Sequence, residues 1–306
     1  MPDCSIGVMA HNEERNVGRL LERLLAQELQ SVRIREIIVV ASGCTDGTEK
    51  EAGEFAARDA RVRLISEPER RGKSAAINVF LAESSAPLCV VVCADTLPAP
   101  DAIEMLAAPL ADPEAGMAGA RPIPLNSKNS FSGYVVHFLW DMHHQVALRQ
   151  PKCGEMIAFR RVFDRMPEDT IVDEPQIEAL IREAGLKVLY APGAVVYNLG
   201  PDNLAEIIMR RRSIVAGYMR LARRTNYRTA SQRQRWWLLR TVFGRILRGE
   251  EPFFKAAGAM AVELLARSLG WWDACFSNKP LNLWTPAEST KAPAEAEKRI
   301  AARSGG

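Results

Sequence analysis

The stretch LCVVVCADTLPAP (88–100) indicates what kind of sheet this chain builds. Residues 88–93 are all apolar, include three consecutive valines, and show none of the alternation that a half-exposed strand requires. Such a run is typical of a parallel strand that is covered on both faces. Asp95 follows the run, and Pro98 and Pro100 argue against any continuation of the strand. We therefore predict an interior strand that ends on a carboxylate, which could be a metal ligand, a helix cap or a turn residue.

Apolar runs and amphipathic stretches alternate along the first two hundred residues, and this alternation predicts an α/β fold with a mostly parallel sheet. Residues 101–135 show a weaker pattern, which we interpret as a short helix, a proline-rich strand and a Ser/Asn loop. The expected strands are 5–10, 36–42, 61–66, 88–94, 155–161, 187–192 and 194–198, and the expected helices are 12–25, 48–58, 74–84, 133–148 and 174–185.

Charge is distributed unevenly along the chain. The net charge is only +3, but residues 201–276 contain 14 Arg or Lys against 6 Asp or Glu. Basic helices with interleaved aromatic residues are typical of an interfacial helix on anionic lipid, although packing on the sheet also accounts for part of the pattern. No nucleic-acid module accompanies the charges, so we expect a membrane surface and no nucleic acid as a partner. The aromatic residues are Trp236, Trp237, Phe253, Phe254, Trp271 and Trp272.

The compartment is indicated by three further observations. The six cysteines form no CxxC pair, which is typical of reduced thiols in a cytosolic protein. No stretch approaches the roughly 18 to 20 uncharged apolar residues of a membrane span, and the chain opens directly on a predicted strand rather than on a leader.

Residues 276–306 are rich in Pro, Ala and charge and are expected to be disordered.

Polar residues follow four of the predicted strands where each strand ends. The segments are AHNEE (10–14), SGCTDGT (42–48), EPERRGKSAAIN (67–78) and ADT (94–96). Ligands collect at the carboxyl ends of parallel strands, so four polar ends predict a binding crevice. Asn12 as a helix cap and Asp46 as a turn residue remain alternatives. RRGKS is not a Walker A loop because Glu67 stands where its first glycine is required, and no GxGxxG motif follows the first strand.

In this order and spacing, the four segments resemble those of the family 2 glycosyltransferases, which have the GT-A fold. The resemblance continues through GEMIAFRR (154–161), VDEPQIEALIREAG (172–185) and MRRRSIVAG (209–217), and it covers about residues 4–220. It implies a GT-A catalytic domain over 1–200 and an inverting, metal-dependent transferase. The basic amphipathic helical region over 201–275 is expected from its composition alone.

The resemblance also implies roles for individual residues. Asp95 matches the last acid of the family's DxD element, which holds Mg²⁺ or Mn²⁺ against the donor's diphosphate. Glu174 stands eleven residues before the helix-ending Gly185, where the family has its general base, and Asp173 is the second candidate. A helix N-terminus is the alternative explanation for both acids. The implied nucleotide-sugar residues are Ala10, His11, Asn12, Glu13, Ser42, Asp46, Lys73, Asn78, Ala94, Asp95 and Arg212, and the implied acceptor-side residues are Trp140, Gly154 and Glu155.

Three positions depart from the family pattern. Ala41 stands where many relatives have the aspartate that reads uracil, so a UDP-sugar is expected but not fixed. Cys93 replaces the first acid of DxD, which leaves Asp95 with fewer protein partners for the metal. The processive synthases carry QxxRW, whereas residues 209–213 read MRRRS, which argues against a polymer-extruding enzyme.

We therefore expect a non-processive hexosyltransferase at the inner face of the cell membrane. It would transfer one sugar from a nucleotide-diphospho-sugar to the hydroxyl of a lipid-linked acceptor or an envelope glycan. Two alternatives remain: a sugar nucleotidyltransferase, whose glycine-rich loop is absent from AHNEE, and a catalytically silent membrane scaffold, which Ala41 and Cys93 would fit. The pair His143 and His144 either contacts the acceptor or lies on a helix flank.

Overall fold

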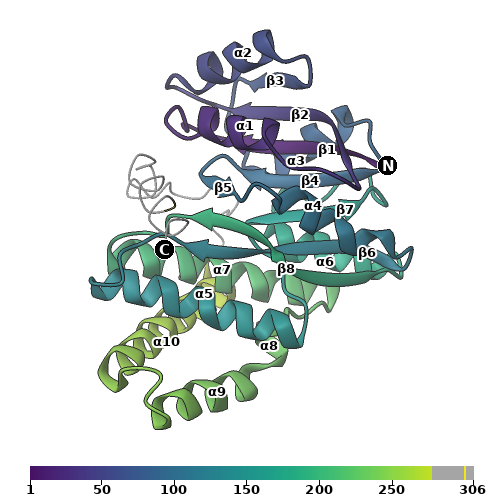
Figure 1. Ribbon diagram of the computed structural model, residues 1–306. Helices are drawn as coiled ribbons and strands as arrows, with labels where there is room; N and C mark the ends of the chain where they lie inside the picture. Colours follow the sequence, from purple (N-terminus) through teal and green to yellow (C-terminus); the bar gives the residue numbers. More distant parts are fainter. Residues whose placement is uncertain (278–299, 301–306) are drawn as a thin grey trace.

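The computed structural model describes residues 1–277 and residue 300, and within them eight strands form a single sheet (Figure 1). Along the sheet the order is β3-β2-β1-β4-β7-β6-β8-β5, in which β1 to β4 run parallel to one another and β7 runs antiparallel to both of its neighbours. The strands are β1 (Asp3–Ala10), β2 (Arg33–Ser42), β3 (Val62–Glu67), β4 (Leu88–Cys93), β5 (Thr96–Pro98), β6 (Ala115–Pro124), β7 (Met156–Arg160) and β8 (Lys187–Asn198).

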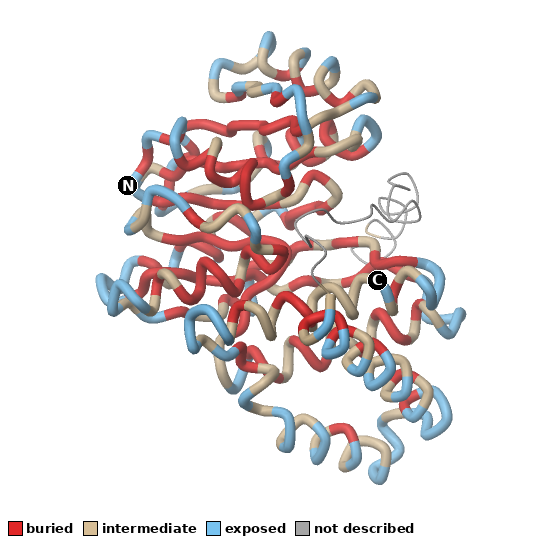
Figure 2. Tube along the Cα trace, turned by 180° about the vertical axis from the view of Figure 1, so that it is seen from behind, coloured by how far each residue is buried: buried red, intermediate tan, exposed pale blue. Residues whose placement is uncertain are grey.

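Helices cover both faces of the sheet, which explains why its strands are continuously apolar. In β2, Ile37 and Val39 pack on one face, whereas Ile38 and Val40 pack on the other. The first face is covered by α1 (Val17–Leu25), α2 (Thr48–Arg58) and α4 (Ala102–Ala107), which continues into the 3-10 helix η1 (Ala108–Ala111). The second face is covered by α3 (Lys73–Glu83) and α6 (Asp173–Glu183). Figure 2 shows the result, a sheet that is buried along most of its length. The α/β prediction is confirmed.

Below the sheet in Figure 1 lies a layer of helices with an apolar core of its own. It consists of α5 (Phe131–Arg149), α7 (Leu204–Thr225), α8 (Ala230–Arg233), α9 (Arg235–Leu247) and α10 (Phe253–Phe276). α5 comes from the part of the chain that was assigned to the catalytic domain, yet it packs against the helices of the C-terminal part. Of the expected tail at 276–306, Phe276 ends α10, and residues 278–299 and 301–306 lie outside the described residues.

The stretch 88–100 differs from the prediction at its end. β4 stops at Cys93, one residue before its expected end, and after a turn the chain forms β5, which pairs antiparallel with β8 at the sheet edge. Pro98 is tolerated there because an edge strand needs hydrogen bonds on one side only. The two strands expected at 187–192 and 194–198 are one strand, β8, and its pairing with β6 shifts register between Gly119 and Arg121.

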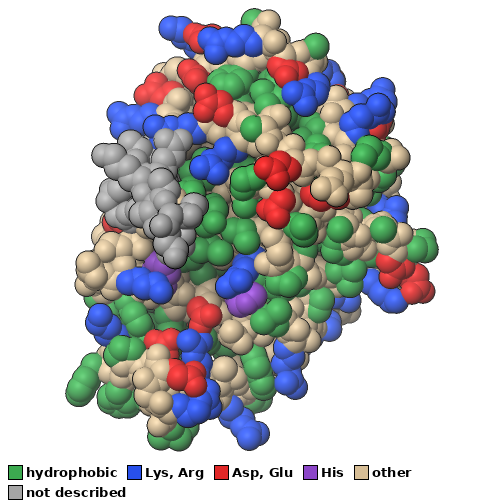
Figure 3. All heavy atoms as spheres, in the orientation of Figure 1, with side chains coloured by type: hydrophobic (Ala, Val, Ile, Leu, Met, Phe, Trp, Pro, Cys, Tyr) green, Lys and Arg blue, Asp and Glu red, His purple; other side chains and the backbone are tan. Residues whose placement is uncertain are grey.

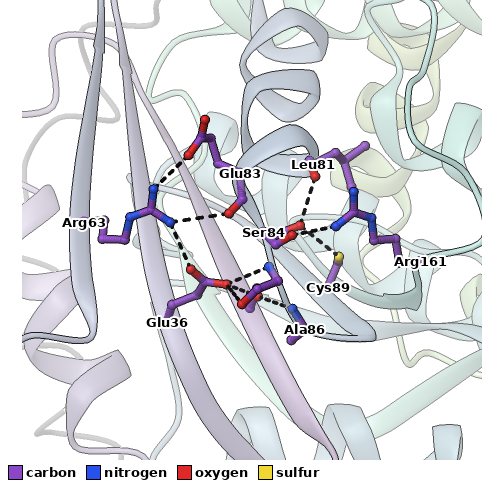
Figure 4. A network of polar contacts seen from close by, with 10 residues as sticks. Glu36, Arg63, Leu81, Glu83, Ser84, Ala86, Cys89 and Arg161 are labelled. Carbon is purple, nitrogen blue, oxygen red and sulfur yellow. Dashed lines mark hydrogen bonds and ion pairs between the residues drawn. The ribbon is translucent and has the colours of Figure 1, made fainter.

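A polar network closes the amino ends of the strands (Figure 4). Glu36, which is buried in β2, accepts hydrogen bonds from Ser5 Oγ at 2.7 Å, from Ser85 N at 2.8 Å and from Arg63 Nη1 at 3.2 Å. Burial alone would raise the pKa of Glu36, but these hydrogen bonds hold it below its ordinary value. Arg63 also reaches Glu83 at the end of α3. The network ties three strands and one helix together at the edge opposite to the predicted crevice.

Candidate active site

A cavity of about 600 Å³ lies between the carboxyl end of β4, the amino ends of β7 and α6, and the helices below the sheet. Its polar wall contains Asp95, Glu155, Asp173, Glu174 and Arg210. Its apolar wall is built from side chains of α5, α7, α9 and α10, and these include Phe138, Trp140, Ile214, Leu238, Val242 and Met260. One cavity therefore joins the sheet edge to the helical layer.

A lysine and two carboxylates form the centre of the polar wall. Lys73 Nζ lies 2.6 Å from Asp173 Oδ2 and 3.3 Å from Glu174 Oε1. Gly72, with φ at +99°, makes the turn that starts α3 directly at Lys73, and residues with a Cβ rarely adopt this angle. The two acids occupy the first turn of α6. The ends of two helices thus position one cation between two anions.

The two carboxyl groups differ in the direction of their pKa shifts. Burial and then the neighbouring Glu174 raise the pKa of Asp173 to about 6. Burial would raise the pKa of Glu174 as well, but Lys73, a backbone hydrogen bond and Arg210 together lower that pKa below its ordinary value. Glu174 therefore carries the negative charge at neutral pH, when it can accept a proton.

Asp95 follows β4 and lines the cavity, and its carboxylate makes no hydrogen bond or ion pair with any described residue. Nearby, Glu155 accepts hydrogen bonds from Asn198 Nδ2 at 3.0 Å and Arg210 Nη2 at 3.5 Å. Burial raises the pKa of Glu155, and Arg210 opposes that effect. Asp95 is thus a carboxylate left available for a ligand, beside one that is already bonded.

The cavity offers few protein ligands to a divalent metal. No group of three or more His, Cys, Asp or Glu residues in the described part of the chain is arranged to hold an ion. Burial raises the pKa of Cys93, so its thiol stays neutral and is a poor ligand for a hard cation. Asp95 supplies one carboxylate. That set fits Mg²⁺ or Mn²⁺ when diphosphate oxygens and water complete the coordination, because Mg²⁺ is commonly bound through one or two carboxylates plus phosphates.

Several residues implied for the nucleotide side are hydrogen-bonded within the tips of β1 and β2. Asn12 Oδ1 accepts from Thr45 N at 2.8 Å, and His11 Nδ1 lies 2.7 Å from Ser42 O. Asp46 accepts from Thr48 N at 3.0 Å, which is the turn alternative considered above. Asn12 does not cap α1, which begins at Val17. Of the implied set, Glu13, Lys73 and Asp95 line the cavity, whereas Ala10, His11, Asn12, Ser42, Asp46, Asn78, Ala94 and Arg212 do not.

Asn78 supports the segment that leads to the acids. Its side chain accepts from Met166 N and donates to Met166 O, both at 2.9 Å. One turn earlier in α3, Ser74 Oγ donates to Thr170 O at 2.9 Å. α3 therefore positions Lys73 and also holds the segment that carries Asp173 and Glu174.

Arg212 needs a correction as a candidate diphosphate contact. It pairs with Asp273 of α10, with 2.6 Å between Nη2 and Oδ1, and does not line the cavity, whereas Arg210 does. The motif indicated where an arginine stands in the sequence, but it did not indicate which face of α7 carries that arginine. Met209 and Ser213, one turn apart, line the cavity together with Arg210, and helical periodicity from those two positions would have found it.

On the acceptor side, Trp140, Gly154 and Glu155 all line the cavity. His143 lines it too, whereas His144 hydrogen-bonds Tyr190 Oη at 2.8 Å and does not. His143 therefore fits the acceptor-side explanation, and His144 fits the explanation of a helix flank. Lys152, which sequence reasoning missed, also lines the cavity; its only signal was a charge beside an apolar strand.

Comparisons with known proteins agree with this arrangement. Residues 5–182 match the family described as "Glycosyl transferase family 2". A curated "N-acetylglucosaminyltransferase" of Rhizobium meliloti (strain 1021) is 26% identical over 175 residues, which are 49% of this chain and 40% of that protein. The chain therefore aligns with less than half the length of this curated relative.

Two solved structures show the fold. "Mannosyltransferase PcManGT from Pyrobaculum calidifontis in complex with GDP-Man and Mn2+" superposes with a TM-score of 0.62 at 22% identity, over 98% of this chain and 89% of that one. Glucosyl-3-phosphoglycerate synthase from Mycobacterium tuberculosis, in complex with Mn2+ and UDP-Glc, gives a TM-score of 0.54 at 22% identity, over 74% of this chain and 80% of that one. The fold of this chain is GT-A.

Proposed function

The chain belongs to glycosyl transferase family 2, and on this premise we propose that it transfers a hexosyl group from a nucleotide-diphospho-sugar, a UDP-sugar in the first instance, to an acceptor hydroxyl with inversion. The observation that carries the proposal is the meeting of an available carboxylate, Asp95, with the Lys73–Asp173–Glu174 group in one cavity. GDP-sugars are the second candidate donors, because Ala41 leaves the base unspecified and a structural neighbour was solved with GDP-Man.

Glu174 is the proposed general base. It is ionised at neutral pH because Lys73 lowers its pKa, and it would take the proton of the acceptor hydroxyl as that oxygen attacks the sugar. Attack from the side opposite to the leaving group inverts the configuration in a single step. Asp173 and Lys73 orient Glu174, and Asp173 remains the second candidate for the base.

The departing diphosphate gains negative charge, and the proposal assigns its stabilisation to two cations of the cavity, Lys73 and Arg210. Asp95 would hold Mg²⁺ or Mn²⁺, which supplies further neutralisation of that charge. Support comes from the two structural neighbours, both of which were solved with Mn2+.

The proposed setting is the inner face of a membrane, with a lipid-linked acceptor. No helix in the described part of the chain is long and apolar enough to cross a bilayer. The outer face of α9 and the start of α10 nevertheless expose Trp236 (68%), Phe243 (63%), Leu247 (72%) and Phe254 (87%). Figure 3 shows hydrophobic side chains together with Lys and Arg at this lower end of the molecule. The exposed arginines of α9 and the turn that follows it, Arg235, Arg240 and Arg248, complement an anionic lipid surface.

The direct test is a panel of UDP- and GDP-sugars with Mn²⁺. We expect at least one donor to raise the melting temperature of the protein and to release its nucleotide diphosphate. A chain that binds a donor but never turns it over would be a silent scaffold, and release of pyrophosphate from a nucleoside triphosphate and a sugar phosphate would indicate a nucleotidyltransferase. The absence of both binding and turnover across the panel would refute the proposal.

A further inference from the structure

A buried lysine lines the cavity. Lys152, which lies in the segment before the strand β7, is only 8% exposed and lines the cavity. Its ammonium group makes no hydrogen bond or ion pair with any described residue. A buried amine without a partner is costly, because its charge loses the hydration it has in water. Such a group is expected where a ligand supplies the missing partner.

The groups around Lys152 leave a surplus of positive charge. Arg211 of α7 and Arg267 of α10 share one carboxylate, Glu263, at 2.7 and 2.8 Å. Glu178 of α6 faces the same region, but it accepts hydrogen bonds from a backbone amide and a tyrosine instead. Burial and then Arg211 lower the pKa of Lys152 to about 7, and the two glutamates only partly oppose them. The protein thus has more cations here than it neutralises.

His143 of α5 adds an unused hydrogen-bonding atom to the same cavity. The side chain is 8% exposed, and Nε2 has no hydrogen-bond partner among the described residues. Burial and then Lys152 hold the pKa of His143 well below its ordinary value, so the ring is neutral, and in the tautomer protonated on Nε2 it can donate to a ligand. A second, independent polar atom is therefore left for a ligand.

Apolar side chains also line the cavity, and some of them reach the surface. We give the name inner chamber to the following lining residues: Lys152, His143 and Arg211, together with Val146, Leu238, Leu239, Val242, Met260 and Leu264. Leu239 of α9 and Leu264 of α10 line the cavity and are at the same time 44% and 60% exposed. The chamber therefore opens between α9 and α10, close to the apolar surface proposed to face the membrane.

We propose that the inner chamber binds the acceptor through an anionic phosphate group on Lys152, His143 and Arg211, while an apolar chain attached to that phosphate lies along the leucine walls and leaves between α9 and α10. The acceptor is then a phosphate-bearing amphiphile. This inference rests on the proposed function, because only a glycosyltransferase needs an acceptor beside Glu174. It adds the acceptor's chemical class and the residues that recognise it.

The test uses the full-length chain and three probes that separate the two parts of the site. Octyl phosphate carries both anion and chain, 1-octanol carries the chain alone, and inorganic phosphate carries the anion alone. In isothermal titration calorimetry below the micellar concentration, octyl phosphate is expected to bind at least about tenfold more tightly than either partial probe. Equal affinity for octyl phosphate and octanol would refute the anion site. Equal affinity for octyl phosphate and inorganic phosphate would refute the apolar part.

One substitution and a matched control assign the effect to Lys152. K152M keeps the length of the side chain but removes its charge, and we expect at least about tenfold weaker binding of octyl phosphate with unchanged binding of octanol. K50M, at an exposed lysine of α2, should bind all three probes as the wild type does. Unchanged octyl phosphate binding by a folded K152M protein would overturn the assignment. If K152M does not fold, the three-probe comparison on the wild type decides the proposal.

The pH dependence gives a second readout. Octyl sulfate keeps a constant charge over pH 6–9, so a change in its affinity reports on the protein. Lys152 loses its proton as the pH rises past about 7, and the affinity should fall over that range. A flat profile would contradict the role of Lys152. UDP-glucose binding with Mn²⁺, measured on the same samples, separates the two proposals: loss of donor binding counts against the proposed function, and loss of probe discrimination counts against the chamber.

Discussion

Charged groups lie at both ends of the sheet's strands, which we call the amino edge and the carboxyl edge. These groups are similarly buried, but they differ in whether their hydrogen-bonding atoms have partners. At the amino edge, Glu36 is 8% exposed and has hydrogen bonds from two serines and an arginine (Figure 4). At the carboxyl edge, Lys152 is also 8% exposed but has no bonded partner among the described residues, and neither has the half-buried Asp95. Burial therefore does not distinguish these two groups of charges, whereas the number of their hydrogen-bonding partners does.

The difference has an energetic meaning. A buried charge whose partners are all within the protein contributes to stability, and removing it leaves those partners unsatisfied. A buried charge without a partner costs stability in the free protein, so its use must lie in a bound state. Substitutions at the two edges should consequently separate stability from activity.

The largest effect is expected at the carboxyl edge, for E174Q. The substitution removes the proposed base but keeps the shape of the side chain, so kcat should fall by about 10²–10⁴-fold, the range typical of general base catalysis. The donor's dissociation constant should stay the same in calorimetry. A fully active E174Q enzyme would transfer the role to Asp173, and D173N is the variant to compare with it.

D95N tests the metal side of the same edge. Removing the single available carboxylate should raise the Mn²⁺ concentration needed for half-maximal activity by about 10–100-fold, since even indirect supports of metal ligands cost that much. A Mn²⁺ titration of the donor hydrolysis rate measures the shift. An unchanged Mn²⁺ requirement would show that Asp95 is a turn residue only.

The matched change at the amino edge is E36A. Here we expect the reverse outcome, which is a loss of stability without a loss of donor binding. Ser5, Ser85 and Arg63 lose their acceptor, so the free energy of unfolding should fall by about 2–3 kcal/mol in urea titrations while donor binding persists.

The sign of the pH dependence follows from the lowered pKa of Glu36. Its contribution is present above the ordinary value of 4.5 and is lost as the pH falls through the lower folded value. The stability difference between wild type and E36A should therefore shrink below pH 4.5. Loss of donor binding in a folded E36A protein would break the distinction between the edges.

The smallest effect is expected outside both edges, at the exposed surface of α9. F243S should weaken sedimentation with anionic vesicles by about tenfold, because one buried phenylalanine contributes roughly 1.5–3 kcal/mol and insertion is incomplete. M105S, at an exposed methionine of α4, is the matched control. Equal loss of vesicle binding in the two variants would show that α9 has no special role.

The sequence predicted the parts of this molecule in which one residue pattern has one physical solution. The apolar run 88–93 could only be a strand covered on both faces, and the helix at 48–58 has the predicted bounds. Patterns with two solutions were harder: Pro192 and Gly193 resembled a break between strands, but β8 continues through them at an irregular register. The pairing of β5 depends on β8, a hundred residues away, so no local signal contains it.

The site divides in the same way. Lys73, Glu174 and Asp95 stand in contiguous motifs, and the structure brings them to one cavity, although their roles stay predictions. Arg212 was implied by the family motif alone, and the structure pairs it with Asp273 instead. Lys152 had no motif to mark it, because its environment comes from four different helices.

Three consecutive arginines of α7 make contacts in three directions. Arg210 reaches Glu155 beside the sheet, Arg211 reaches Glu263 in the middle of α10, and Arg212 reaches Asp273 near its end. Successive residues of a helix are rotated by about 100°, so a single register of α7 satisfies all three contacts at once. The rotational position of α7 therefore determines all three ion pairs together. Inserting one residue just before Arg210 would rotate all three arginines away from their acidic partners at once, whereas any point substitution removes only one ion pair.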